Sequence, residues 1–409
     1  MQEHVHSASV TVESAIQREI RTGAQLPPLV VVLFTTLLAF AVLYMPQPIL
    51  PLLAVQFGVA ETDAALLTSV TLVPLGLAPI FYGFLTERIS TKTLLRTAVG
   101  LLAVTEVLFG VATDFWLLVV LRFAQGLLLP AIFTSLITYA SSTASADRVR
   151  HAVSYYIGTS ILGGFGGRFL GGSVSAYLEW RWAFFLMAGL LVGAWVLLGF
   201  LQSAPQSRRN SDTRPLIRLG AISEILSGRI FRYACLGIFV VFFVYASVLN
   251  YIPFRLTALS ADISELAISL VYAGYLSGAL IALNGVRISG WVGGEVRGIF
   301  VGLSLLIVGL SGLLLPSLVA SYVFAITMSC GFFLVHSLLS AFINHRATGS
   351  KGLVNGLYLA FYYSGGALGS WLPGFLYRAS GWNTYIATLT ALLALACWWM
   401  WQLRSASQR

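Results

Sequence analysis

Apolar residues recur along this chain in runs of about 20, and short polar stretches separate the runs. An α-helix of about 20 apolar residues is long enough to cross the hydrocarbon core of a bilayer. The chain is therefore predicted to be an all-α integral membrane protein with twelve transmembrane helices. The expected spans lie at about 29–54, 64–86, 93–112, 115–140, 150–177, 181–202, 232–256, 264–286, 296–314, 317–342, 352–377 and 382–402.

The longest polar connection divides these spans into two sets of six. It is rich in arginine, with Arg208, Arg209, Arg214 and Arg218. We expect two pseudo-symmetric six-helix bundles joined by a cytoplasmic linker. The expected boundaries are 1–28 for an N-terminal tail, 29–202 for the first bundle, 203–231 for the linker, 232–402 for the second bundle and 403–409 for a C-terminal tail.

The composition excludes a soluble protein with an ordinary surface. Hydrophobic residues make up 58% of the 409 residues and charged residues only 10%, with a mean hydropathy of +0.86, whereas an average soluble domain is about 25% charged. No phosphate-binding loop, metal-ligand cluster or nucleophile arrangement stands out in the sequence, so we expect neither an enzyme nor an ATP-driven pump, and no cofactor or metal. The three cysteines lie within apolar runs and are expected to be buried without disulfides.

The distribution of positive charge predicts the orientation. With the N-terminus inside, 19 of the 24 Lys and Arg lie on the cytoplasmic side, two lie within the membrane, and only Arg181, Arg255 and Arg378 lie outside. This is the positive-inside bias of membrane proteins. It predicts that both termini are cytoplasmic in the inner (plasma) membrane, and it explains the net charge of +9 without a nucleic-acid partner. The lipid bilayer is the expected surrounding partner, and we expect a monomer.

The two sets of six also repeat one another in sequence. YMP at residues 44–46 matches YIP at 251–253, and YYIG at 155–158 matches YYSG at 362–365, both at an offset of 207. RIS at 88–90 is echoed at 287–289. The order and the near-constant offset predict a duplicated six-helix unit. Two parallel halves around a central site are the layout of an alternating-access carrier.

The fifth span contains a stretch, residues 155–172, with seven glycines and one arginine. Gly163, Gly167 and Gly171 fall four apart, so on a helix they form a stripe without side chains, against which another backbone packs closely. Gly172 extends this helix-packing seam. In the eighth span Gly274 and Gly278 are also four apart, and we expect them to be the mate of the seam across the two halves.

Three motifs resemble the major facilitator superfamily over essentially the whole chain. Residues 83–92, GFLTERISTK, resemble its G-x-L-a-D-R-x-G-R-K loop, with Glu for Asp and Ser for the second Gly. RFAQG at 122–126 resembles its R-x-x-Q-G element. The glycine stripe resembles the antiporter motif G-x3-G-P-x2-G-G, with Arg168 where proline is usual.

Further residues resemble the YnfM-like subgroup of the drug:proton antiporter branch, namely GFF at 331–333, HS at 336–337 and the tyrosines around 358–363. The resemblance implies the twelve-helix fold and transport driven by a proton gradient. It also implies that the loop containing Gly83, Glu87, Arg88 and Lys92 acts as a conformational latch. The alternative is that these loop charges serve topology alone.

Ionisable side chains inside the membrane are the main candidates for chemistry. Glu106 and Arg122 lie at similar depths in the third and fourth spans, so an ion pair between them is expected. One interpretation is a structural pair that neutralises two costly charges. The other is that Glu106 takes up and releases the coupling proton, although third helices in the resembling fold are mostly peripheral.

Arg168 has no second embedded carboxylate to pair with. It either donates to helix-end carbonyls or snorkels outward, or it faces the central cavity, where it binds an anionic group or competes with Arg122 for Glu106. His336 is a hydrogen-bonded packing residue or a second proton carrier.

Other polar and aromatic side chains in the spans are expected to line a cavity for a small-molecule substrate, and their weak polarity suits a semi-apolar compound. With Arg122 and Arg168 the candidates are Tyr44, Gln47, Gln125, Tyr155, Tyr245, Asn250, Tyr358 and Tyr362. Prolines such as Pro46 and Pro48 are expected to kink the helices that line the path, with or without a role in transport.

The leading hypothesis is a secondary active transporter for proton-coupled efflux of moderately apolar or drug-like compounds. A second hypothesis is uptake or exchange of a small organic anion held by Arg168. A third, from a different class, is a transport-inactive membrane sensor or scaffold, and the nearly complete latch motif argues against it.

Overall fold

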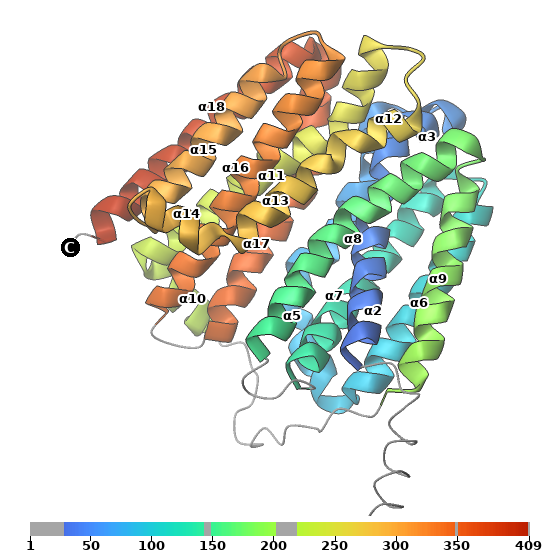
Figure 1. Ribbon diagram of the computed structural model, residues 1–409, viewed down its shortest axis with the longest axis horizontal. Coiled ribbons are helices and arrows are strands. Elements are labelled where there is room, and N and C mark those ends of the chain that lie inside the picture. The colour runs from blue at the N-terminus through green and yellow to red at the C-terminus, as the bar shows by residue number, and fades with distance from the viewer. Residues whose placement is uncertain (1–27, 143–148, 202–218, 348–350, 408–409) are drawn as a thin grey trace, which may run out of the picture.

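A computed structural model describes residues 28–142, 149–201, 219–347 and 351–407, and within these ranges it contains helices and no strand. Figure 1 shows the helices of the first half, coloured blue to green, packed beside those of the second half, coloured yellow to red. The predicted fold class, an all-α membrane protein built from two helical bundles, is confirmed. The exact bundle boundaries stay a prediction.

The first half begins with a helix that breaks near residue 45 and continues through long, nearly antiparallel helices. Its elements are α2 (Pro28–Tyr44), η1 (Gln47–Ile49), α3 (Leu50–Phe57), α4 (Glu61–Ala64), α5 (Leu66–Arg88), α6 (Thr91–Val111), α7 (Phe115–Ser142), α8 (Val149–Tyr177) and α9 (Arg181–Gly199).

The second half contains a broken helix at 265–283, and its last helical element, Pro373–Ser407, turns at Gly381, where a φ of 75° permits the turn between the last two expected spans. Its elements are α10 (Leu219–Ser227), α11 (Arg229–Leu259), α12 (Glu265–Leu270), η2 (Val271–Ala273), α13 (Gly274–Leu283), α14 (Gly285–Trp291), α15 (Glu295–Gly312), α16 (Leu318–Arg346), α17 (Lys351–Trp371) and α18 (Pro373–Ser407).

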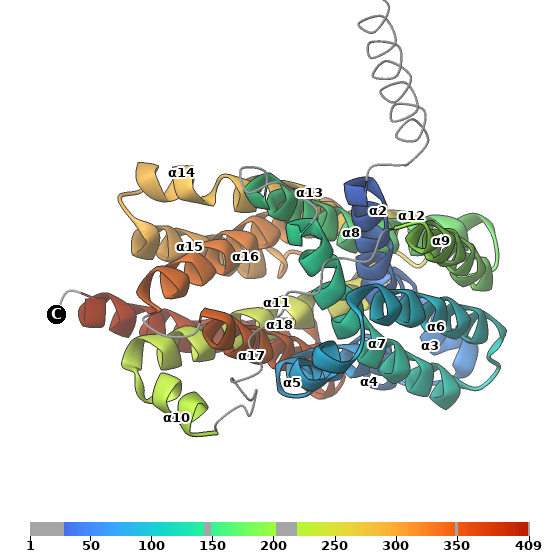
Figure 2. The same cartoon turned by 90° about the horizontal axis from the view of Figure 1, so that it is seen from below.

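Nine helices in the described ranges are long and apolar enough to cross a membrane. The helices α5, α8 and α17 occupy the remaining three expected spans, and they are 23, 29 and 21 residues long. The two halves meet at these three helices, because α5 packs on α17 and α8 packs on α12 and α13. Figures 1 and 2 agree in placing α5 beside α17 and α8 beside α13.

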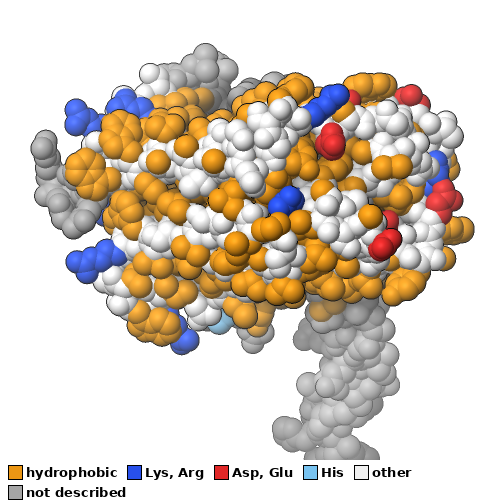
Figure 3. All heavy atoms as spheres, turned by 90° about the horizontal axis from the view of Figure 1, so that it is seen from above, with side chains coloured by type: hydrophobic (Ala, Val, Ile, Leu, Met, Phe, Trp, Pro, Cys, Tyr) orange, Lys and Arg blue, Asp and Glu red, His pale blue; other side chains and the backbone are white. Residues whose placement is uncertain are grey.

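The helices end at two opposite faces of the molecule, which are named here the α10 end and the α3 end. The α10 end holds α10 and the first residues of α2, α6 and α8, and the α3 end holds α3 and α12, as Figure 1 shows. Figure 2 looks onto the α10 end. Figure 3 looks onto the α3 end, where hydrophobic side chains cover much of the surface and charged side chains are few.

The glycine stripe of α8 packs against α2 within the first half. A Cβ added at Gly167 would lie 2.5 Å from Ala41 Cα, and one at Gly171 would lie 2.5 Å from the Met45 carbonyl oxygen. The duplicated half repeats this contact, because Gly369 of α17 meets Phe243 of α11 as Gly163 meets Leu37, and both pairs of equivalents are 206 residues apart.

The expectation that Gly274 and Gly278 are the mate of the seam is wrong. These two glycines face Ser329 and Phe333 of α16 within the second half. The other half meets α8 on a different face, where a Cβ at Gly172 would lie 2.5 Å from the Glu265 carbonyl oxygen. Since each residue rotates a helix by about 100°, the stripe at 163, 167 and 171 cannot face α2 and the other half at once.

Candidate functional site

The break in α2 creates carbonyl acceptors deep in the first half. Pro46 has no N–H, so the Val42 carbonyl, four residues earlier, loses its helical donor. Arg122 of α7 supplies replacement donors, because its guanidinium donates to the carbonyl oxygens of Val42 (2.9 Å) and Leu43 (2.6 Å). It also donates to the Leu67 carbonyl at 2.7 Å. Arg122 is completely buried and thereby ties the broken helix to α5 and α7.

Glu106 and Arg122 belong to one buried cluster, as their matching depths predict, but Gln125 lies between them. Arg122 donates to Gln125 Oε1 at 2.7 Å, and Gln125 Nε2 donates to Glu106 Oε1 at 2.9 Å. Because a guanidinium only donates, this orientation of the amide follows from its neighbours. Glu106 Oε2 is buried without a hydrogen-bond partner in the described part of the chain. The expected direct ion pair is therefore replaced by a relay through an amide.

Arg168 lies where the two halves meet, and it is also completely buried. Its Nε donates to Gln47 Oε1 at 2.6 Å, and its two terminal nitrogens donate to the Gly164 carbonyl at 2.7 Å and to the Tyr275 hydroxyl at 3.1 Å. None of these partners is charged, and Glu106 is not among them. Arg168 therefore donates to a carbonyl of its own helix, as one expectation had it. It also contacts the other half, which agrees in part with the expectation that it faces the centre.

Three tyrosine rings surround the guanidinium of Arg168. Its Cζ lies 4.1 Å from the ring centre of Tyr44, 4.2 Å from that of Tyr275 and 4.8 Å from that of Tyr272. Rings at these distances attract a cation through their electron-rich faces. Two of the three tyrosines come from the second half, so aromatic rings of both halves contact the guanidinium of Arg168.

An aromatic wall continues from Tyr275 through the second half. Tyr245 stacks on Phe332 with ring centres 3.9 Å apart and donates to Ser329 Oγ at 3.0 Å. The wall ends at the half-buried His336 (Figure 2 shows its helix, α16), whose Nδ1 lies 3.0 Å from the Tyr358 hydroxyl. Tyr362 packs against His336 with ring centres 4.8 Å apart. These candidates therefore form one continuous, weakly polar surface.

Gln47 and Asn250 join the halves near the α3 end. Gln47 Nε2 donates to Asn250 Oδ1 at 3.2 Å, and Asn250 Nδ2 donates to the carbonyl oxygens of Ala65 (3.2 Å) and Ser370 (2.8 Å). Both side chains are buried. Tyr155, by contrast, is 57% exposed and does not join this cluster.

Lys92 is the latch candidate whose side chain lies among the described residues. Gly83, Glu87 and Arg88 belong to α5, and the side chains of Glu87 and Arg88 lie outside the described residues. Lys92 donates to the carbonyl oxygens of Gly199 (2.9 Å) and Leu201, and it thereby caps the end of α9. Lys92, at the end of the loop, thus supplies donors to carbonyl oxygens at the end of α9, where no intrahelical donor is available.

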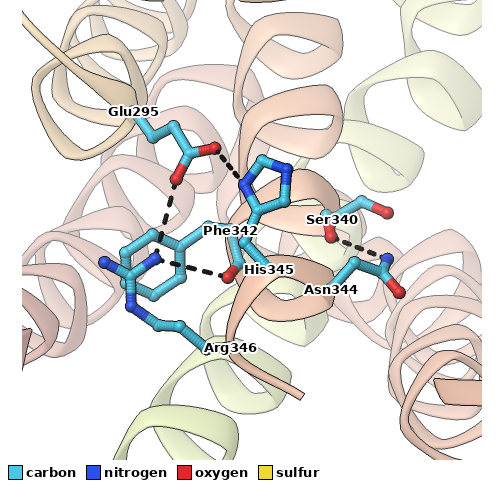
Figure 4. Close-up of polar contacts among 6 residues, drawn as sticks. All are labelled: Glu295, Ser340, Phe342, Asn344, His345 and Arg346. Carbon is cyan, nitrogen blue, oxygen red and sulfur yellow. Dashed lines mark hydrogen bonds and ion pairs between the residues drawn. The ribbon is translucent and has the colours of Figure 1, made fainter. Parts of the chain in front are cut away.

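The second half has a charged cluster near its counterpart of the latch loop. Glu295 in the first turn of α15 lies between His345 Nδ1 (2.9 Å) and Arg346 (3.7 Å) at the end of α16, as Figure 4 shows. Figure 4 also shows Asn344 donating to the Ser340 carbonyl. These contacts are partly exposed, so they are worth about 0–1 kcal/mol each.

Sequence reasoning missed Tyr272 and Tyr275. Their signal was present, because two tyrosines three residues apart share a helix face beside Gly274. Nothing in the sequence pairs that face with Arg168. No group of His, Cys, Asp and Glu suited to a metal ion occurs among the residues that the structure describes.

Comparisons with known proteins agree with this architecture. The sequence model of a protein family, the Major Facilitator Superfamily, matches residues 32–370 of this chain. The inner membrane transport protein YnfM of Escherichia coli (strain K12) is 27% identical over 372 residues, which covers 88% of this chain and 86% of that protein. The multidrug resistance protein MdtG of Salmonella paratyphi A (strain ATCC 9150 / SARB42) is 31% identical over 164 residues, which covers 38% of this chain and 39% of that protein.

A solved structure has the same fold. A bacterial homolog to the human lysosomal transporter Spinster, in an inward-facing and occupied conformation, matches with a TM-score of 0.77 and 13% identity. The match covers 92% of this chain and 96% of that chain. At this identity the likeness concerns the fold alone.

Proposed function

The chain belongs to the Major Facilitator Superfamily, and from that premise we propose that it exports a small, moderately apolar organic anion in exchange for protons. The family and its relatives make the chain a multi-pass membrane secondary transporter and not an enzyme. The observation that carries the finer proposal is Arg168, a completely buried cation at the junction of the halves whose partners are all neutral.

The anionic group of the substrate binds Arg168. A buried charge is costly unless an opposite charge pairs with it. No acidic side chain in the described residues pairs with Arg168, and its three hydrogen bonds use three of its five N–H donors. A carboxylate suits the planar fork of a guanidinium, which donates two parallel hydrogen bonds to it.

The apolar body of the substrate lies against the aromatic wall. The ring centre of Tyr275 lies 6.3 Å from that of Tyr44 and 6.2 Å from that of Tyr245, and the wall extends to Phe332 and Tyr362. Such surroundings favour a compound with an aromatic or aliphatic body over a heavily hydroxylated sugar. Carriers with two repeated halves bind near the middle of the membrane, between the halves, and the position of Arg168 fits that pattern.

The proton binds Glu106. It is the only buried acidic side chain in the described part of the chain. Its carboxylate connects through Gln125 to Arg122, which holds the broken end of α2, and Gln47 follows that break and contacts Arg168. Neutralising Glu106 removes a charge from this connected set, and we propose that α2 transmits the change to the substrate site.

Two observations support export over uptake. The α8 glycine stripe resembles an antiporter motif, and part of the chain is similar to a protein named for multidrug resistance. We further propose a monomer in the inner membrane with both termini in the cytoplasm, driven by the proton gradient without a bound cofactor. The charge bias of the loops supports this orientation.

The test uses proteoliposomes with a pH-sensitive dye inside. Phenylacetate is compared with phenylacetamide, which has a similar shape but no charge. We expect proton movement with the anion only, and Arg168→Lys is expected to reduce it at least tenfold because lysine lacks the planar fork. Arg181→Lys, at the α3 end, is the matched control. Equal responses to acid and amide would refute the anion site.

The same vesicles test the coupling site. Glu106→Gln is expected to abolish proton movement while leaving exchange of labelled substrate across the membrane intact. If substrate still releases protons in this variant, Glu106 is not the coupling residue and His336 becomes the candidate. The sign of the pH change for each vesicle orientation separates export from uptake. Absence of exchange with any of a diverse substrate panel would favour a sensor or scaffold.

A further inference from the structure

A groove on the membrane-facing side of the first half stands apart from the central site. It has a volume of about 450 Å³ and lies between α6 and α9, which pack on one another. Its wall side chains are apolar and largely exposed, and they include Leu101, Val104, Val107, Val192 and Trp195. In a membrane protein such a surface faces the hydrocarbon of the lipids.

A glycine keeps the groove open. Gly100 lies on the groove, and a Cβ there would come 3.0 Å from Trp195 Nε1. Arg96 lies one turn earlier on the same face of α6, and its guanidinium stands 4.4 Å from the centre of the Trp195 ring. The indole that lines the groove therefore has a cation over its ring, and aliphatic side chains line much of the rest of the groove.

The cation at the end of the groove lacks an acidic partner. Arg96 Nε is buried and has no hydrogen-bond partner, and none of the ion pairs in the described ranges involves Arg96. Lys92, one further turn away, is already engaged with the carbonyls at the end of α9. Among the described residues Arg96 is thus a cation without an acidic partner, and an anion from outside the protein can supply one.

The dimensions match one leaflet of a bilayer. Arg96 is five residues from the start of α6, so it lies within about 8 Å of the α10 end of that helix. From Arg96 to Val107 the helix rises about 16 Å, which is roughly half of the ~30 Å hydrocarbon core. Trp195 is the type of residue that gathers at the boundary between headgroups and acyl chains.

We propose that this groove binds an anionic glycerophospholipid, with its phosphate on Arg96 and an acyl chain between α6 and α9. The unpaired positive charge favours a lipid with net negative charge over a zwitterionic one. The site does not depend on the transport proposal, because the main packing of α6 and α9 in the described ranges is with each other and with α2, α7 and α8 of the first half.

The test is a lipid titration of the purified full-length protein in detergent, read by native mass spectrometry. Phosphatidylglycerol and phosphatidylcholine with identical acyl chains are compared. We expect the wild type to bind one phosphatidylglycerol at least fivefold more tightly than phosphatidylcholine. Arg96→Gln is expected to weaken phosphatidylglycerol binding about fivefold, which corresponds to about 1 kcal/mol for one cation near a headgroup.

Two further variants separate the charge from the groove. Val104→Phe fills the groove, leaves Arg96 in place, and changes an exposed side chain, so folding is expected to survive. It should lower the affinity for both lipids and keep their ratio. Arg232→Gln is the charge control, because Arg232 also stands beside an aromatic ring, 5.5 Å from that of Tyr233, and is exposed. It should leave both affinities unchanged.

Three results would overturn the proposal. Equal wild-type affinities for the two lipids would exclude an anion site without reliance on any variant. An equal loss of phosphatidylglycerol binding in Arg232→Gln would assign the effect to general surface charge. A wild-type dimer that Val104→Phe converts to a monomer would mean that a second copy of the chain, and not a lipid, covers the groove.

Discussion

Replacing Gly167 with alanine tests how the first half is held together. The added Cβ would lie 2.5 Å from Ala41 Cα and 2.6 Å from its carbonyl carbon, both backbone atoms that no side-chain rotation can move. Favourable carbon–carbon contacts begin near 3.5 Å. The helices α2 and α8 must therefore separate by about 1 Å, and Arg168, the next residue, moves with α8 away from Gln47.

The neighbouring glycine provides a matched control. A Cβ at Gly166 would have no neighbouring atom within 4 Å. Both substitutions gain the same helix propensity, about 1 kcal/mol, so this gain cancels when the two variants are compared. The difference in stability then reports overpacking alone, which costs about 1–3 kcal/mol.

Unfolding by SDS in mixed micelles, followed by tryptophan fluorescence, measures this difference. We expect Gly167→Ala to be less stable than Gly166→Ala by about 1–3 kcal/mol. Gly166→Ala should equal or exceed the wild type. If Gly167→Ala is as stable as its control, the close contact between α2 and α8 is not the packing that the glycine stripe serves.

Two other substitutions address the polar relay and the latch. Gln125→Leu removes the one donor to Glu106 among the described residues and an acceptor of Arg122, so the same unfolding assay should show a loss of about 1–3 kcal/mol. Unchanged stability would mean that the relay contributes nothing to the fold. Glu87→Ala is expected to abolish vesicle transport while membrane insertion, measured by fractionation, stays normal. Transport at the wild-type rate would remove the latch role.

The fold was predictable from the sequence because membrane insertion depends on few variables. The apolar runs, the duplication and the three motifs each predicted the architecture, and the family assignment is confirmed over residues 32–370. The break in the first span followed from Pro46 and Pro48, since proline removes helical donors. These inferences needed only length, hydropathy and local backbone chemistry.

The contacts between helices were less predictable, because they depend on rotation about each helix axis. The depths of Glu106 and Arg122 predicted their proximity, yet Gln125 lies between them because it is one turn from Arg122 on the same face. The glycine stripe predicted close packing but not its partner. The pairing of Arg168 with Tyr275 required knowledge of how the halves dock.

Arg168 is the donor in each of its hydrogen bonds, and this fixes the orientation of the amide side chains beyond it. A guanidinium has no acceptor, so the Gln47 oxygen must face it, and the Gln47 amino group is left for Asn250. The Asn250 oxygen accepts, so its amino group must reach the backbone of Ala65 and Ser370. If the anion proposed as substrate accepts the Nε–H hydrogen bond of Arg168 in place of Gln47, the first amide is released to rotate. We therefore expect anion binding at Arg168 to alter the hydrogen bond between Gln47 and Asn250, which joins the halves near the α3 end.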